Sequence, residues 1–196
     1  MFPIKSMLAA LALSLGVASV AAPIAAAQGT TVLVIDQRRI MATSRAGKDI
    51  QQKITNIENA MKNELRPLAT QIENDGKALE AKTAGKTQEA LRADASLRTE
   101  AQNYTNKIQN YERRRAIAAQ ELTLTERKAW GDFYNALRPV LQEVVAERGA
   151  QIIVDRSNAV YASPSSDATD LAIQKLDAKT PTISVVRQKM PTQQAQ

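Results

Sequence analysis

The sequence of 196 residues contains no cysteine and no histidine, and aromatic residues make up only 4% of it. Cysteine nucleophiles, histidine general bases and the usual zinc sites are therefore excluded, which leaves carboxylate, lysine, tyrosine or hydroxyl chemistry for catalysis. No metal motif or glycine-rich phosphate loop accompanies those residue types. The composition thus predicts a protein that is not an enzyme, with no metal and no cofactor.

The first 27 residues have the pattern of a cleaved signal peptide. Lys5 supplies a positive charge, residues 7–20 form an apolar run, and Ala25-Ala26-Ala27 fits the small-x-small cleavage rule, with Ala22 as an earlier alternative. A membrane anchor is the competing interpretation, but the apolar run is broken and close to the minimum spanning length. We therefore expect export to the periplasm and a mature chain that begins at Gln28.

The scarcity of aromatic side chains after residue 27 leaves little material for one large hydrophobic core. This favours an extended or oligomeric architecture. The net charge of +6 becomes +5 without residues 1–27, which contain one lysine and no acidic residue. Such an excess indicates attraction to anionic surfaces or acidic partners. Nucleic acid is not expected as a partner of an exported protein.

Two long helical patterns follow a short strand. Residues 31–35 are β-branched and predict a buried strand, and Asp36 is a candidate N-cap for a helix over 37–43. From Ile50 to Leu79 the apolar residues recur in steps of three and four, which is the spacing of a coiled-coil seam. Gly47 should weaken this helix by about 1 kcal/mol relative to alanine. Pro67 and Pro139 each predict a kink within a continuing helix.

A turn at Gly85 should reverse the chain into a second helix that runs to Arg148 and ends at Gly149. With Gly85 as the hinge, Lys48 would lie opposite Leu122, and residues 48–122 would form an arm of about 55 Å.

After the second helix the pattern predicts a β-hairpin, with strands over 151–155 and 159–162, that joins the first strand in one sheet. A final helix should follow residues 164–167, and residues 179–196 should be a disordered tail. The predicted fold is α+β and mostly α, with a coiled-coil hairpin projecting from a β-sheet oligomerisation base formed by 28–47 and 123–178. Pooled strands from several chains would give this small base a shared core.

Three segments resemble the Skp/OmpH family of periplasmic chaperones. They are residues 32–48, which lead from a strand into a helix, the strand-turn-strand segment 152–162, and the helix start Asp167-Ala168-Thr169-Asp170. The resemblance implies a homotrimer whose helical arms surround a cavity and hold unfolded outer-membrane proteins without ATP. It also implies a possible affinity for lipopolysaccharide. The rival hypothesis is an exported structural or adaptor coiled coil of the cell envelope.

Holding an unfolded chain loosely requires scattered apolar contacts and positive charge. The candidate apolar residues are Met61, Leu68, Ile72, Leu79, Leu91 and Leu97, and the candidate basic residues are Lys77, Lys82, Lys86, Arg92, Arg98, Arg113, Arg114 and Arg115. The alternative is that the first set forms the seam of the hairpin and the second an ordinary solvated face. Asp36 and Asp155 could be read as paired catalytic carboxylates, but each follows a strand and is expected to cap or turn the chain.

Overall fold

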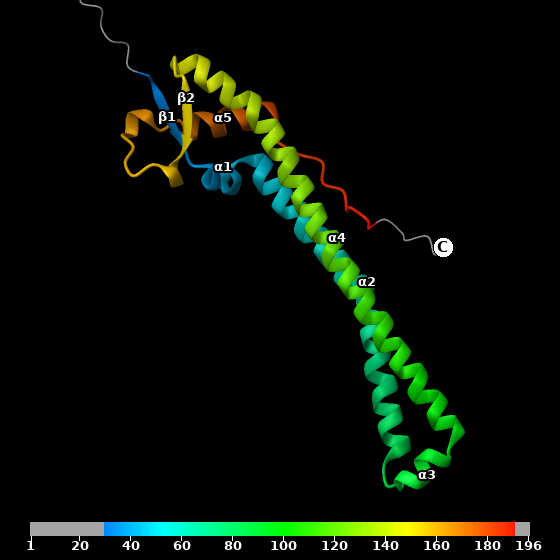
Figure 1. Ribbon diagram of the computed structural model, residues 1–196. Helices are drawn as coiled ribbons and strands as arrows, with labels where there is room; N and C mark the ends of the chain where they lie inside the picture. Colours follow the sequence, from blue (N-terminus) through cyan, green and yellow to red (C-terminus); the bar gives the residue numbers. More distant parts are fainter. Residues whose placement is uncertain (1–29, 191–196) are drawn as a thin grey trace, which may run out of the picture.

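The computed structural model describes residues 30–190. Two long antiparallel helices project from a small base that contains a two-stranded sheet (Figure 1). The elements in chain order are β1 (Val32–Ile35), α1 (Gln37–Thr43), α2 (Arg45–Thr83), α3 (Gln88–Ala93), α4 (Ala95–Arg148), β2 (Ile152–Asp155), the 3-10 helices η1 (Arg156–Asn158) and η2 (Pro164–Ser166), and α5 (Thr169–Lys179). The predicted α+β class and helical hairpin are confirmed. The predicted signal peptide, 1–27, lies outside the described residues.

The sheet pairs β1 with β2 in parallel, with Val32 opposite Ile152 and Ile35 opposite Asp155. Parallel strands need a crossover connection, and here the crossover is the entire hairpin, because α4 runs past the sheet before the chain turns back. Gly149 makes that turn in the left-handed conformation, at φ 59°. The left-handed region favours glycine, so the predicted helix end at this residue is confirmed.

The predicted second strand of the β-hairpin, 159–162, is wrong. The Asp155 carboxylate accepts the Ser157 N–H at 2.8 Å and turns the chain into η1 directly after β2. The chain then leaves the sheet, and Val160 and Tyr161 are almost fully exposed. A single bridge joins Val34 to the segment at Asp167 on the free side of β1.

The core lies where the roots of the hairpin meet the sheet and α5. Phe133, Ile40 and Ile50 are fully buried there, and α5 adds Ala172 and Leu176. Phe133 also packs edge-to-face between two neighbouring aromatic side chains of α4. The largest fully buried side chains thus lie at one end of the molecule, and the arm has only a narrow apolar seam.

A close approach of two backbones fixes the junction between α1 and α2. Ser44 ends α1 and caps α2, its hydroxyl accepting the Gly47 N–H at 3.1 Å. A Cβ built on Gly47 would lie 1.8 Å from the Met41 carbonyl oxygen. The close contact with Met41 therefore requires glycine at position 47. The sequence alone indicated only that Gly47 weakens the helix.

The hairpin is closed by the short helix α3 and not by Gly85 alone. Asp94 caps α4 by accepting the Leu97 N–H, so the second long helix begins later than predicted. The ion pairs Lys82–Glu100 and Asp75–Lys107 show that the arms pair around α3. The expected pairing of Lys48 with Leu122 is wrong by about three turns. Leu122 instead shares a cavity with Met61.

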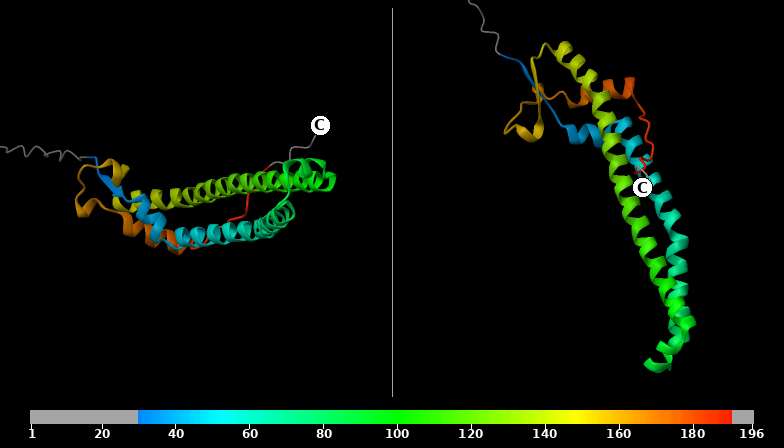
Figure 2. Two further views of the ribbon diagram at one scale, coloured as in Figure 1. Left: turned by 90° about the horizontal axis from the view of Figure 1, so that it is seen from below. Right: turned by 45° about the vertical axis from the view of Figure 1, so that its right-hand side comes forward.

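The prediction of a disordered tail is wrong for residues 180–190, which we call the strap. The strap leaves α5 and runs in an extended conformation along the hairpin (Figures 1 and 2). Ile183 in the strap is only 8% exposed and belongs to the core cluster. The last residues, 191–196, lie outside the described part of the chain.

Candidate functional site

The predicted apolar contact residues of the arm divide into two groups. Met61 and Leu97 are buried, with 4% and 6% exposure, so they form the seam of the hairpin in the single chain. The other four are half-buried and present part of their apolar surface to solvent: Leu68, Ile72, Leu79 and Leu91. The second group fits loose contact with a partner better, because its surface is still available.

An apolar cavity of about 300 Å³ opens midway along the arm. Met61 and Leu65 line it from α2, and Tyr111, Ala118 and Leu122 line it from α4. The α2 part of the lining, residues 58–69, spans Pro67, through which α2 continues without ending. Mostly aliphatic walls with basic residues at the rim suit an apolar side chain of an incoming polypeptide.

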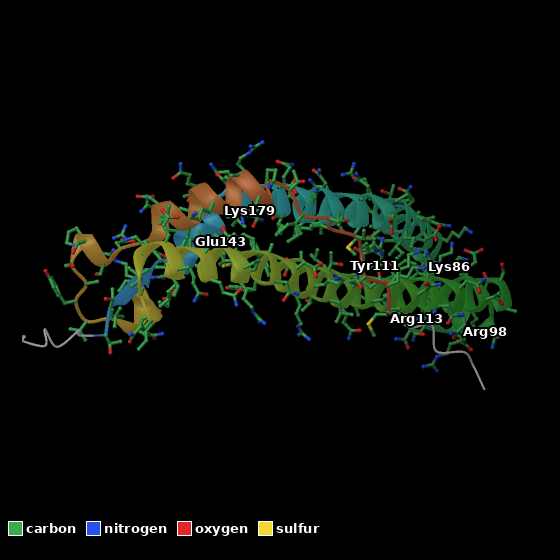
Figure 3. The ribbon with its side chains drawn as sticks, turned by 90° about the horizontal axis from the view of Figure 1, so that it is seen from above. Lys86, Arg98, Tyr111, Arg113, Glu143 and Lys179 are labelled. Carbon is green, nitrogen blue, oxygen red and sulfur yellow. The ribbon has the colours of Figure 1, made fainter. Side chains whose placement is uncertain are left out.

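The predicted basic residues of the arm are all exposed. Figure 3 shows Lys86 and Arg98 near the tip and Arg113 farther from it. The three lysines pair with acidic side chains of the arm: Lys77 with Glu73, Lys82 with Glu100 and Lys86 with Asp94. These lysines therefore form the solvated ion-pair face that was the alternative interpretation.

The arginines leave more charge free. Arg115 lies 3.7 Å from Glu112, a long and exposed ion pair. Within residues 30–190, no acidic side chain pairs with Arg92, Arg98, Arg113 or Arg114. These four arginines thus leave positive charge available on the arm.

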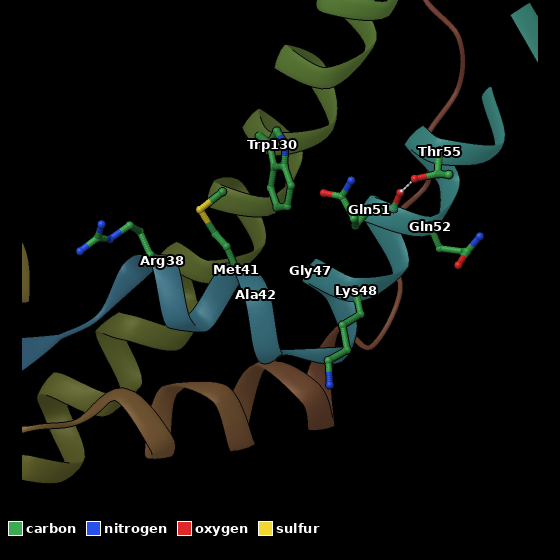
Figure 4. Close-up of a pocket in the computed structure, with 9 residues that line it drawn as sticks. All are labelled: Arg38, Met41, Ala42, Gly47, Lys48, Gln51, Gln52, Thr55 and Trp130. Atoms are coloured by element: carbon green, nitrogen blue, oxygen red, sulfur yellow. Dashed lines mark hydrogen bonds between the residues drawn. The ribbon is translucent and has the colours of Figure 1, made fainter. Parts of the chain in front are cut away.

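A second, larger cavity of about 610 Å³ lies where the hairpin meets the base. Met41 and Trp130 lie beside each other on one side of it, and Gln51 and Thr55 lie on another (Figure 4). Arg38 and Lys48 add positive charge to the lining. Sequence reasoning did not single out this cavity, because it forms only when α1, α2 and α4 come together.

Asp36 and Asp155 both serve as caps, so that interpretation of the two carboxylates is confirmed. Asp36 accepts the Arg39 N–H at 2.9 Å, and Asp155 accepts the N–H groups of Ser157 and Gln37. The hydrogen bonds from Ser157 hold the pKa of Asp155 below its ordinary value, and burial opposes them only in part. Asp155 thus stays ionised as a structural acceptor.

The strap makes the contacts that sequence reasoning missed. On α2, Asp49 accepts the Ile183 N–H at 3.0 Å, and Lys53 donates to the Ile183 carbonyl at 2.7 Å. On α4, Thr125 accepts the Gln188 N–H at 2.9 Å. The only sequence signals of this arrangement were the short apolar run 183–186 and the arginine after it.

Glu121 is the most buried charged residue of the described chain, at 6% exposure. Its carboxylate accepts the Met190 N–H at 3.0 Å and the Arg187 Nε–H at 2.8 Å. Arg187 also reaches Glu64 on α2, at 2.8 Å. Burial by itself raises the pKa of Glu121, but these strap contacts outweigh it and leave the pKa below its ordinary value.

No membrane crossing is indicated by the helices of residues 30–190, since none of them joins sufficient length to sufficient apolarity. The arm and base form one elongated helical hairpin, and its exposed apolar and basic side chains are dispersed along the arm.

Comparison with known proteins agrees with this description. The family described as outer membrane protein (OmpH-like) matches residues 31–176, and the chain belongs to this family. A solved structure from Caulobacter crescentus CB15, described as an outer membrane chaperone (OmpH-like), is 27% identical, with a TM-score of 0.72. That match covers 84% of this chain and 94% of the other. No curated protein matches the chain.

Membership of the OmpH-like family supports a chaperone role and a non-enzymatic kind of protein. The matched range ends at residue 176, so both long helices lie inside it and the strap lies outside it.

Proposed function

We propose that the protein is an ATP-independent periplasmic holdase that binds unfolded outer-membrane proteins between helical arms. The observation that carries the proposal is the half-buried apolar stripe of the arm, formed by Leu68, Ile72 and Leu79 on α2 and Leu91 on α3. A stripe of this kind gives many weak contacts without one defined pocket, which suits a mixture of extended clients. The likeness to a solved OmpH-like chaperone supports the same function.

The binding cavity requires more than one chain, and we propose a homotrimer. Val160 and Tyr161 are almost fully exposed in the loop between η1 and η2, and the sheet before this loop has only two strands. Exposed β-branched and aromatic residues close in sequence to so small a sheet suit pairing with another chain. Three hairpins that share such a base would project side by side and enclose a space between them.

Light scattering tests the holdase function. A β-barrel outer-membrane protein unfolded in urea is diluted into buffer with and without the protein, in the absence of nucleotide. The protein should suppress aggregation, and the suppression should weaken as salt is raised, because exposed charges are screened over about 8 Å at physiological ionic strength. Aggregation that proceeds unchanged would refute the holdase function and favour the exported structural or adaptor protein.

The unpaired arginines of the arm support a second proposal, which is binding to an anionic lipid surface such as lipopolysaccharide. Arg113 and Arg114 are consecutive exposed residues of α4, and neither has an acidic partner among the described residues. Sedimentation with vesicles that contain or lack anionic lipid measures this binding. Replacement of both arginines by glutamine should abolish the difference between the two vesicle types. A difference that persists would refute this role.

A further inference from the structure

The strap is held by the contacts that a bound peptide would make. It has no helical or strand hydrogen bonding, yet it runs along α2 and α4 and contacts side chains of both helices (Figure 2). Ile183 and Arg187 turn inward, whereas Val186 is 66% exposed. The strap is therefore an extended segment that lies in a groove between two helices.

The base-proximal part of this groove recognises backbone. Asp49 and Lys53 are one helical turn apart and hold the N–H and the carbonyl of the same strap residue, Ile183. The two side chains also pair with each other at 2.7 Å, so the clamp keeps its shape. Because both atoms it contacts belong to the main chain, the clamp would accept other residues in the same extended conformation.

Thr125 and Glu121 continue this backbone recognition on α4. The Thr125 hydroxyl accepts the Gln188 N–H and donates to the Glu121 carbonyl, so both of its functions are used. The Glu121 carboxylate accepts the Met190 N–H. Together with the clamp, four strap backbone groups are bound by helix side chains.

Two strap side chains add selectivity. Ile183 enters the core cluster, and Arg187 bridges Glu64 on α2 and Glu121 on α4. Four residues of extended chain span about 13 Å. Lys53 and Glu64 are about 16 Å apart along the helix, and the arginine side chain covers the remainder. The groove thus reads an aliphatic residue followed by arginine four positions later.

We propose that this groove is a binding site for extended polypeptide segments that carry an aliphatic residue four positions before an arginine, and that the strap occupies it in cis. The inference rests on the client-holding function proposed above, since an unfolded client supplies such segments. The helices that form the groove belong to the family match, and the strap follows it. The strap is therefore an intramolecular competitor that a client segment displaces.

Fluorescence anisotropy of a labelled peptide with the sequence of residues 180–190 tests the exchange. In the full-length protein the tethered strap competes at an effective concentration on the order of mM, so the free peptide should bind weakly. Arg187→Ala should strengthen peptide binding at least about tenfold, because it leaves the buried Glu121 carboxylate without its charged partner and so weakens the strap by that factor or more. The peptide that carries the same Arg-to-Ala change should bind neither protein.

Lys189→Ala is the matched control, since it removes the same charge from an exposed strap residue. It should leave peptide binding within about twofold of the wild type. Ile183→Ala and Val186→Ala, at a buried and an exposed strap residue, form a second matched pair. Their difference in peptide binding tests the proposal if the Arg187 variant loses helicity. Equal peptide binding within both pairs would overturn the proposal and leave the strap as a structural clasp.

Aggregation suppression by the same variants separates this inference from the holdase function. A displaceable strap predicts that Arg187→Ala suppresses aggregation at a lower protein concentration than Lys189→Ala does. If the peptide exchanges but neither variant suppresses aggregation, the groove stands and the holdase function is refuted. If both suppress aggregation equally and the peptide does not exchange, the holdase function stands and the groove is refuted.

Discussion

The same substitution, glycine to alanine, should have opposite effects at two helical positions. At Gly47 the new Cβ would meet the Met41 carbonyl oxygen at 1.8 Å. Even the 3.0 Å that real Cβ atoms rarely undercut would need a movement of about 1.2 Å between the backbones of α1 and α2. The residues that would have to move include Ile40 and Ile50, which are fully buried. The clash therefore strains the core itself.

The expected change in the free energy of unfolding for Gly47→Ala is the difference of two effects. Strain of this kind costs about 3 kcal/mol or somewhat more, and alanine recovers about 1 kcal/mol of helix propensity. Gly47→Ala should therefore destabilise the protein by roughly 2–4 kcal/mol. Gly131 lies on the exposed side of α4 with open space around it, so Gly131→Ala should stabilise the protein by about 1 kcal/mol.

Thermal unfolding followed by circular dichroism at 222 nm measures both changes. One kcal/mol corresponds to roughly 2–4 °C for a chain of this size. Gly47→Ala should lower the midpoint by about 4–16 °C, and Gly131→Ala should raise it by about 2–4 °C. A midpoint for Gly47→Ala equal to or above that of the wild type would refute the close approach of α1 and α2.

Three further predictions follow from the core, the strap and the exposed loop. Phe133→Ala should lower the free energy of unfolding in urea by about 3–5 kcal/mol. Replacement of its half-exposed neighbour, Tyr134→Ala, should lower it by less than about 1 kcal/mol. Equal losses for the two variants would contradict the placement of the core. The strap should detach in acid. The pKa values of Glu121 and Asp49 are lowered in the docked state, so their contribution is present above the ordinary carboxyl pKa and lost as the pH falls below about 4. Around Glu121 the charged groups are Arg187, Lys189 and Glu64. A fluorophore on Ser184→Cys should thus keep constant anisotropy from pH 6 to 9 and lose it below about pH 4 while helicity persists; unchanged anisotropy would count against carboxylate control. Tyr161→Asp should dissociate the oligomer in analytical ultracentrifugation, whereas Val186→Asp should not; an unaffected oligomer would show that this loop is not its interface.

Features set by local sequence could be predicted well. Asp36 caps α1 as expected, Gly149 ends α4 in the left-handed conformation, and Ile50, Ile54 and Met61 are buried in the seam at the predicted spacing. Each of these depends on residues within one or two helical turns. The predicted helix after residue 167 is confirmed for the same reason, as α5.

Features set by distant contacts could not be predicted. The strap looked like a disordered tail, since its composition is polar with only a short apolar run. What orders it are contacts with Asp49, which is 134 residues from Ile183, and with Glu121, which is 69 residues from Met190. Glu121 itself resembles a solvated helix residue in the sequence. The strand predicted over 159–162 failed because the Asp155 cap turns the chain first.

The candidate site shows the same division. Helical spacing located the apolar stripe of the arm, but burial separates Met61 and Leu97 from the residues that remain available. The basic residues of the arm are evident in the sequence. Their ion pairs across the hairpin depend on the helix register that α3 sets. The apolar and basic residues of the arm can therefore be predicted from the sequence, but only the tertiary structure shows which of them are exposed and unpaired.

Native mass spectrometry of the protein mixed with an unfolded outer-membrane β-barrel, without nucleotide, tests the central claim most directly. The account predicts a single complex that contains three copies of this chain and one client. A client that aggregates alone, while the protein keeps the mass of a monomer or a dimer, would contradict it.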